Sequence, residues 1–370
     1  MRMFFYGLGG SFLLALGALW LVIGHYELRG LAPLGRGKGT SYLAGLACAG
    51  LGAFALFTVG PLAALWLLVG LPLAASLILC LSVLAYRSPN LDPLVPFRDG
   101  LPGHWRSEQV SFPLGKEGVL GKGLLMVPKE SRGAGVVVAH GLGNDGECFK
   151  WKLYGALLGR GLAVLALDLA GHGRRRDTPL RYPEVLSEIP ASVSYLASRP
   201  EVRGGEIGAL GVSLGGALAL RAAGDDERIK AVVTLAAPHH LEVGRAGIIR
   251  EVLTLLSPPI LRLFREASLY HLLKVWVGKR PNLGMAAEEL VAKLEVLEAA
   301  RRIAPRPLLL IHGAEDHAIP PEQAEAIFRM TGEPKRLVKL VGQSHLTMLF
   351  SSQAVEATAQ WFECYLTDSN

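Results

Sequence analysis

Charged side chains are distributed very unevenly along this chain, and their distribution constrains the fold more than any other feature. Residues 1–86 contain only five of them: Arg2, Glu27, Arg29, Arg36 and Lys38. Residues 3–24 and 39–86 are uncharged, whereas a helix needs ~20 apolar residues to cross a bilayer. The sequence therefore predicts an apolar, all-α transmembrane anchor over residues 1–87 and a globular domain after it.

The lengths of the two uncharged runs predict three membrane spans. The first run can cross once, over residues 3–24, and the second can cross twice, over residues 42–60 and 62–86. We place the break at Pro61 because proline removes a backbone donor and clashes with the preceding helical turn, while Pro72 offers a second possible break. A cleaved signal peptide is the alternative for the first span, but such peptides have apolar runs of only ~7–15 residues.

Positive charges beside the predicted spans indicate their orientation, since Lys and Arg near a span resist translocation. The loop between the first two spans carries Arg29, Arg36 and Lys38, and Arg87 follows the third, whereas only Arg2 lies on the other side. We therefore expect a multi-pass membrane protein with a cytoplasmic globular domain, although a two-span arrangement would separate that loop from the domain. No ionisable residue lies inside the spans, so they are expected to anchor the chain and not to transport.

Composition argues against several kinds of partner. The net charge of +6 is spread over both parts, without a basic run interleaved with aromatic residues, so nucleic acid is not an expected partner. The four cysteines are isolated, which argues against zinc or iron–sulfur sites and suits a reducing compartment. We expect neither a metal nor an organic cofactor, and the sequence does not indicate the oligomeric state.

The globular part, residues 104–370, follows a linker over residues 88–103 that is rich in Pro, Asp, Asn and Gly. Residues 109–114 and 119–127 are expected to form a leading antiparallel pair. Short apolar runs then predict buried strands at 135–139, 162–167, 207–211, 231–236, 307–311 and 336–341, with helices at 149–158, 184–198, 214–223 and 353–366. Such alternation predicts an α/β fold with a mostly parallel, doubly wound sheet.

The alternation stops over about residues 239–304, where helical, partly amphipathic sequence predicts an inserted cap. Residues 239–281 contain seven basic side chains and three glutamates among apolar and aromatic residues. A basic amphipathic surface beside a bilayer would suit an interfacial lid through which a lipid enters. An ordinary substrate cap, whose charges face water, is an equal alternative.

Three polar residues lie where a serine nucleophile, its general base and a group that orients the base would be needed. Ser213 lies between a predicted strand and a predicted helix in the run Gly-Val-Ser-Leu-Gly-Gly, whose glycines permit a tight turn that exposes the hydroxyl. A serine hydroxyl is a weak nucleophile, so it needs a base and a group that orients the base. Asp316 and His345 each follow a later strand, and loops at one edge of a sheet can converge.

Neighbouring polar residues offer alternatives to this assignment. Glu315 and His317 flank Asp316, but each would point elsewhere if Asp316 faces the base. His239 and His240 end another strand, where capping is the more common role and lining the pocket the alternative.

Two further strand ends lie near the expected site. The backbone N–H groups of Leu142, after the first parallel strand, and of Leu214, after Ser213, are candidate oxyanion donors. Residues 168–173 combine Asp with glycines and are expected to form a structural turn. Residues 174–176, three arginines, are expected in a solvated loop that could lie near phospholipid headgroups.

Five motifs occur in a fixed order: HGLGND at 140–145, DLAGHG at 168–173, GVSLGG at 211–216, HGAEDHAIP at 312–320 and GQSH at 342–345. In this order and spacing they resemble the α/β-hydrolase superfamily, over about residues 104–366. Residues 195–200, YLASRP, resemble the branch that groups dienelactone hydrolases and acyl esterases with serine aminopeptidase-like and monoacylglycerol lipase-like enzymes.

The resemblance implies a role for each matching residue. Ser213 would be the nucleophile, His345 the base, Asp316 the orienting acid, and Leu142 and Leu214 the oxyanion donors. The turn between strand and helix that carries the nucleophile is called the elbow. Haloalkane dehalogenases and epoxide hydrolases carry Asp there, whereas this chain has Ser213, so these two activities are not expected.

The favoured interpretation is a membrane-anchored serine hydrolase that cleaves carboxylic esters through an acyl-enzyme. The anchor and cap favour lipid or acylglycerol-like esters, so the expected partners are a small-molecule or lipid ester substrate and membrane lipids. Thioesterases and serine aminopeptidases use the same machinery and remain alternatives. A non-catalytic, membrane-tethered binding module is the alternative from another class, although the intact set of Ser, Asp and His argues against it.

Overall fold

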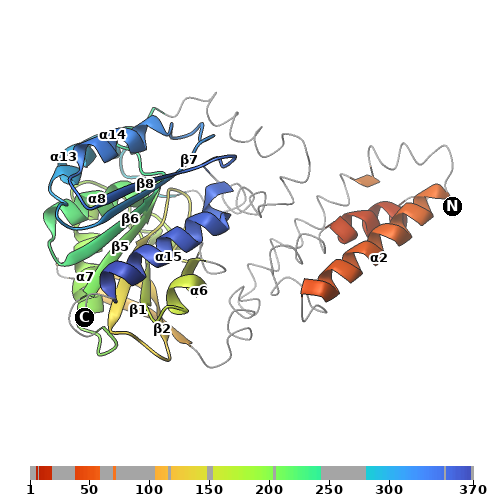
Figure 1. Cartoon of the computed structure of the whole chain (residues 1–370), viewed down its shortest axis with the longest axis horizontal. Helices are drawn as coiled ribbons and strands as arrows, with labels where there is room; N and C mark the ends of the chain where they lie inside the picture. The colour runs from red at the N-terminus through yellow and green to blue at the C-terminus, as the bar shows by residue number, and fades with distance from the viewer. Residues whose placement is uncertain are drawn as a thin grey trace. The chain divides into compact units, whose positions relative to one another are not determined.

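The computed structural model describes the chain over residues 6, 8–18, 38–58, 70–71, 105–115, 118–147, 153–202, 206–242, 281–345 and 347–367. These residues fall into two compact units (Figure 1). The first contains the described residues up to 71, and the second contains those from 105 onward.

An eight-stranded sheet forms the centre of the second unit. Its strands are β1 (Trp105–Pro113), β2 (Leu120–Pro128), β3 (Ala134–Ala139), β4 (Ala163–Asp168), β5 (Glu206–Val212), β6 (Ile229–Leu235), β7 (Leu308–Gly313) and β8 (Lys335–Leu340). Their spatial order is β1-β2-β4-β3-β5-β6-β7-β8. The β1–β2 and β2–β4 pairs are antiparallel and the others are parallel, which confirms the predicted mostly parallel α/β sheet.

Helices cover both faces of this sheet (Figure 1). The main ones are α6 (Leu153–Leu158), α7 (Glu188–Ala197), α8 (Leu214–Asp225), α12 (Ala287–Lys293), α13 (Val296–Arg301), α14 (Glu322–Met330) and α15 (Ser352–Leu366), with 3-10 turns η4 (Gly173–Arg175), η5 (Glu184–Ser187) and η7 (Thr347–Phe350). α6 packs against α15, while α7 and α13 pack against α8. Because helices lie on both faces, β3, β4 and β7 are buried along their whole length, which explains their continuous apolar sequence.

Close packing between α15 and the sheet depends on a matched pair of residues. The ring of Phe362 is fully buried against Gly208 of β5, where an added Cβ would lie 2.4 Å from the ring. This contact lies toward the amino end of β5, whereas the loops that follow the parallel strands lie at the opposite edge of the sheet.

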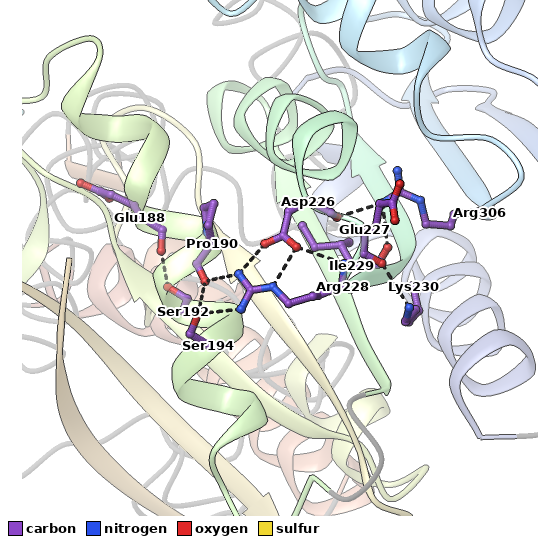
Figure 2. A network of polar contacts seen from close by, with 10 residues as sticks. All are labelled: Glu188, Pro190, Ser192, Ser194, Asp226, Glu227, Arg228, Ile229, Lys230 and Arg306. Carbon is purple, nitrogen blue, oxygen red and sulfur yellow. Dashed lines mark hydrogen bonds and ion pairs between the residues drawn. The ribbon is translucent and has the colours of Figure 1, made fainter. Parts of the chain in front are cut away.

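Arg228 fastens α7 to the segment before β6, and Arg306 holds that segment in turn (Figure 2). Arg228 donates to Ser194 Oγ at 2.8 Å and to the carbonyl oxygen of Pro190 at 3.3 Å, and it also pairs with Asp226. Arg306 donates to the carbonyl oxygen of Asp226 at 2.9 Å. α7 is thus held by polar contacts as well as by its buried apolar face.

Part of the segment that the sequence assigns to the cap belongs to the core. The apolar side chains of α12 and α13, including Leu290, Val291 and Val296, are buried in the main hydrophobic cluster, and α13 packs against α8. An amphipathic pattern gives the same signal for a helix over a sheet and a helix over a pocket, so the sequence could not separate them. Residues 243–280, most of the predicted cap, lie outside the described residues.

The described part of the first unit consists mainly of two helices, one over residues 8–18 and α2 (Lys38–Phe57) (Figure 1). Glycines bring them close together: a Cβ at Gly52 would lie 2.7 Å from the carbonyl oxygen of Gly10, and one at Gly10 would lie 2.9 Å from Leu56 Cγ. Large apolar side chains of α2 are exposed by 60% or more, namely Leu46, Leu51, Phe54 and Phe57. Gly10 and Gly52 therefore allow the two helices to approach closely, with Leu56 buried between them, while the four exposed apolar side chains of α2 point away from the contact.

The predicted membrane spans are not observed as membrane-crossing helices. Over the described residues, no helix combines the length and the apolar character that a crossing requires. α2 overlaps most of the predicted span over residues 42–60. Much of the span predicted over 3–24, and nearly all of the one over 62–86, lies outside the described residues.

Candidate active site

Ser213 occupies a sharp turn between β5 and α8. Its backbone has φ 52° and ψ −121°, a conformation that is rare for any residue but glycine. The turn leaves no room for side chains on its neighbours: a Cβ at Gly211 would lie 2.2 Å from the carbonyl oxygen of Gly215, and one at Gly215 would lie 2.2 Å from that of Ala139. The glycines of the motif thus permit the turn that presents the Ser213 hydroxyl.

The structure brings Ser213, His345 and Asp316 together from three loops. His345 Nε2 lies 3.2 Å from Ser213 Oγ, and His345 Nδ1 lies 2.7 Å from Asp316 Oδ2. Since the carboxylate accepts the hydrogen on Nδ1, Nε2 is left as the acceptor for the serine hydroxyl. This arrangement can remove the proton from Ser213 as its oxygen attacks a substrate.

Asp316 is held in one orientation by its own loop. Its Oδ1 accepts backbone hydrogen bonds from Ala318 at 3.0 Å and from Ile319 at 2.7 Å. Burial by itself would raise the pKa of this carboxyl, but His345 and the hydrogen bonds from His345 and His312 outweigh burial, so the pKa lies well below its usual 3.8. The group is therefore an ionised acceptor for His345.

A second histidine contacts the same carboxylate and was assigned no role in the sequence. His312, the fifth residue of β7, is fully buried, and its Nε2 lies 2.8 Å from the carbonyl oxygen of Ile319 and 3.3 Å from Asp316 Oδ2. Its Nε2–H is shared between these two acceptors. The available signal was a histidine four residues before the candidate acid, at the end of a buried strand.

The two predicted oxyanion donors lie on segments that flank Ser213. Leu214 opens α8 directly after it, where backbone N–H groups have no partner within the helix. Leu142 lies in the turn after β3, and the preceding Gly141 is so close to the elbow that an added Cβ would lie 3.2 Å from Ser213 Cβ.

The structure also gives contacts for other polar candidates. Asp316 faces the imidazole of His345. The backbone N–H groups of His239 and His240 donate to Gln323 Oε1 at 2.9 and 3.2 Å. Within the ranges that the structure describes, no three potential metal ligands gather, so no candidate metal site is identified there.

Comparison with known proteins gives a consistent family match. The model described as "Alpha/beta hydrolase family" matches residues 136–361, more than half of the chain. The uncharacterized protein YfhR of Escherichia coli O157:H7 is 25% identical over 251 residues, covering 66% of this chain and 75% of YfhR. A pyrrolizixenacetamide deacetylase of Xenorhabdus hominickii is 27% identical over 220 residues, covering 54% of this chain and 80% of the deacetylase.

Solved structures share the fold of the second unit. The alpha/beta hydrolase GrgF from Penicillium sp. sh18 aligns with a TM-score of 0.56 at 19% identity, covering 70% of this chain and 99% of GrgF. At that identity the similarity concerns the arrangement of strands and helices alone.

Proposed function

The chain belongs to the alpha/beta hydrolase family, and from that premise we propose that it is a serine hydrolase cleaving carboxylic esters through an acyl-enzyme. The observation that carries this proposal is the continuous hydrogen-bonded path from Ser213 Oγ through His345 to Asp316. A nucleophile, a base and a group that orients the base are the parts this chemistry requires.

Each residue has one role in the proposed reaction. Ser213 Oγ attacks the ester carbonyl carbon while His345 Nε2 takes its proton, and the N–H groups of Leu142 and Leu214 stabilise the oxyanion. His345 then gives the proton to the departing alcohol, which leaves the acyl group on Ser213. A water molecule attacks the acyl-enzyme with His345 as the base, and the carboxylic acid is released. Asp316 keeps the imidazole oriented throughout.

The bond that is cleaved has more than one candidate. Oxygen esters are favoured because an alcohol leaves readily once it is protonated. The similarity to a protein named as a deacetylase supports N-acyl amides as a second bond class. Thioesters and peptides would need the same serine, so a substrate panel, and not the triad, distinguishes them.

A fluorophosphonate probe tests the nucleophile without a known substrate, since it phosphonylates an activated serine and releases fluoride. Wild-type protein in detergent is expected to be labelled, Ser213→Ala is expected not to be, and Ser198→Ala, an exposed serine following α7, serves as the control. Hydrolysis of a reactive ester should fall at least about 10⁴-fold in Ser213→Ala. Folded wild type that resists labelling would refute the proposal and favour a binding module.

We also propose that the first unit associates with membrane lipid. Large apolar side chains directed outward from a helix pair that packs through glycines would be costly in water but suit a lipid environment. The apolar sequence of residues 1–86 supports the same proposal. A lipid or acylglycerol-like ester is then the favoured substrate.

Flotation with phosphatidylcholine vesicles tests the membrane proposal independently of activity. The full chain is expected to float with the vesicles, and the double variant Leu51→Gln/Phe54→Gln is expected to bind less. Leu120→Gln removes an exposed leucine of the second unit and is the matched control. A full chain that stays with the soluble fraction would contradict membrane association, and kcat/KM that falls with increasing acyl length would contradict the lipid substrate.

A further inference from the structure

Residues 168–173 at the end of β4, here called the β4 loop, lie against residues 140–147 after β3, which include Leu142 and are here called the oxyanion loop. The sequence predicts only a structural turn for the motif of the β4 loop, Asp168-Leu169-Ala170-Gly171-His172-Gly173. In the structure, two side chains of this motif also contact the neighbouring loop. Gly143 donates its backbone N–H to His172 Nε2 at 3.1 Å, and Gly146 donates to Asp168 Oδ1 at 2.9 Å. Two backbone N–H groups of the oxyanion loop are therefore held by side chains of the β4 loop.

A third hydrogen bond runs in the opposite direction. Leu169 donates its backbone N–H to Nε2 of His140, which lies at the start of the oxyanion loop, at 3.2 Å. The rings of His140 and His172 meet edge to face with centroids 4.9 Å apart. Both histidines are buried, so the two loops share a small polar interface beneath the surface.

The hydrogen bonds of His172 fix its protonation state. Nδ1 lies 2.8 Å from the carbonyl oxygen of Ala170, so it carries the hydrogen, and Nε2 is then the acceptor for Gly143. Burial, together with the nearby His140, lowers the pKa of His172 to about 4. The imidazole is therefore neutral at the pH at which a histidine base works.

The β4 loop is itself firmly anchored, which is what a support requires. Arg175 and Glu188 form a fully buried ion pair at 2.6 Å, and Glu188 also accepts the backbone N–H of Ala170 at 3.2 Å. Glu188 begins α7, the helix that Arg228 fastens to its neighbours (Figure 2). On its other side the loop pairs with Asn282, whose N–H donates to the carbonyl oxygen of Gly171 at 2.9 Å.

We propose that His172 is a positioning residue for the oxyanion hole. By accepting the N–H of Gly143, its neutral imidazole fixes the turn that contains Leu142, and so fixes the direction of the Leu142 N–H toward the developing oxyanion. The inference rests on the proposed serine hydrolase function. Geometry matters here because a donor helps only at hydrogen-bond distance from the oxyanion, and losing one such donor costs ~10²–10³-fold in kcat.

Two substitutions separate the two hydrogen bonds of His172. In His172→Asn the amide can take the place of Nδ1 and keep the bond to Ala170, but it is too short to reach Gly143. In His172→Gln the side-chain oxygen can take the place of Nε2 and accept from Gly143, while the bond to Ala170 is lost. Since each variant keeps one polar contact, the two should lose stability to a similar degree.

Steady-state kinetics on a p-nitrophenyl ester give the test. His172→Asn is expected to lower kcat at least about tenfold with KM within twofold of wild type, and His172→Gln to keep kcat within about threefold. Phe362→Leu, a core variant at the far edge of the sheet, is the control for lost stability and should keep kcat. Melting temperatures of all four proteins show that the kinetics refer to folded protein.

The outcomes distinguish this inference from the function on which it rests. Wild type that is labelled by the fluorophosphonate, together with His172→Asn that keeps kcat near wild type, overturns the positioning role alone. Equal losses of kcat in the Asn and Gln variants also overturn it, because the bond to Gly143 would then not be the one that matters. Unlabelled, folded wild type overturns the serine hydrolase function itself.

Discussion

The neutral state of His172 makes the stability of the second unit depend on pH in a way that a single substitution should remove. In the unfolded chain a histidine titrates near ~6.5, whereas burial and His140 lower the pKa of His172 to about 4 in the folded protein. Between these values the unfolded chain binds a proton that the folded protein does not, so folding loses stability as the pH falls. A difference of about 2.5 pH units amounts to about 3 kcal/mol by pH 4.

The charged groups that face His172 are few and lie in the same two loops. His140 opposes its protonation, whereas Asp145 and Asp168 favour it, and their combined effect is already contained in the lowered pKa. Other buried groups, such as Asp316 and Glu188, titrate in wild type and in a His172 variant alike. The difference between the two proteins therefore reports the titration of His172 together with its coupling to His140.

Urea unfolding at about pH 7.5 and about pH 4, followed by tryptophan fluorescence, measures this difference. On lowering the pH, wild type should lose about 3 kcal/mol more unfolding free energy than His172→Gln, whose side chain does not titrate. His317→Gln removes an exposed histidine and is expected to follow wild type. Parallel losses in wild type and His172→Gln would refute the assignment of a buried neutral imidazole, and with it the acceptor role toward Gly143.

Two further predictions concern the groups around the elbow. His312→Leu removes one hydrogen-bond donor from the carboxylate of Asp316, which should then stabilise protonated His345 more strongly. The acid limb of the pH profile of kcat/KM should therefore move to higher pH by about a few tenths of a unit. An acid limb that does not move would contradict a contact between His312 and Asp316. Gly215→Ala would force a Cβ to within 2.2 Å of a backbone oxygen, so fluorophosphonate labelling should slow more than about tenfold. Gly50→Ala, at an open helical position, should label at the wild-type rate, and equal rates in both variants would show that the elbow tolerates a side chain.

The strands could be predicted from sequence because their burial leaves a simple signal. Residues 135–139 and 307–311 read as short apolar runs, since helices cover the sheet on both faces, and the structure places β3 and β7 there. The candidate triad could be proposed for a related reason: Ser213, Asp316 and His345 each follow a strand, and strand ends at one edge of a sheet lie close together. Both inferences use only local sequence and the regularity of a parallel sheet.

The features that the sequence did not predict depend on contacts between distant segments. His140 and His172 each hold a backbone N–H that lies 29 positions away, and no local pattern specifies such a pairing. α12 and α13 were assigned to the cap because periodicity gives the spacing of apolar residues but not the surface they cover. In both cases the sequence did not indicate which distant segment each residue or helix contacts.

In the proposed site two histidines have incompatible roles, and the surroundings of each histidine suit it to one role only. A base must gain and lose a proton, and His345 is suited to this because its side chain is 15% exposed and an opposite charge on Asp316 lies within hydrogen-bond distance to stabilise an imidazolium. A fixed acceptor must stay unprotonated, and His172 is suited to that because it is 3% exposed, has backbone partners on both nitrogens and faces a second histidine. In the environment of His172, the base could not hold the proton of Ser213. In the environment of His345, the histidine that supports the oxyanion loop could become protonated, and it would then no longer accept the N–H of Gly143.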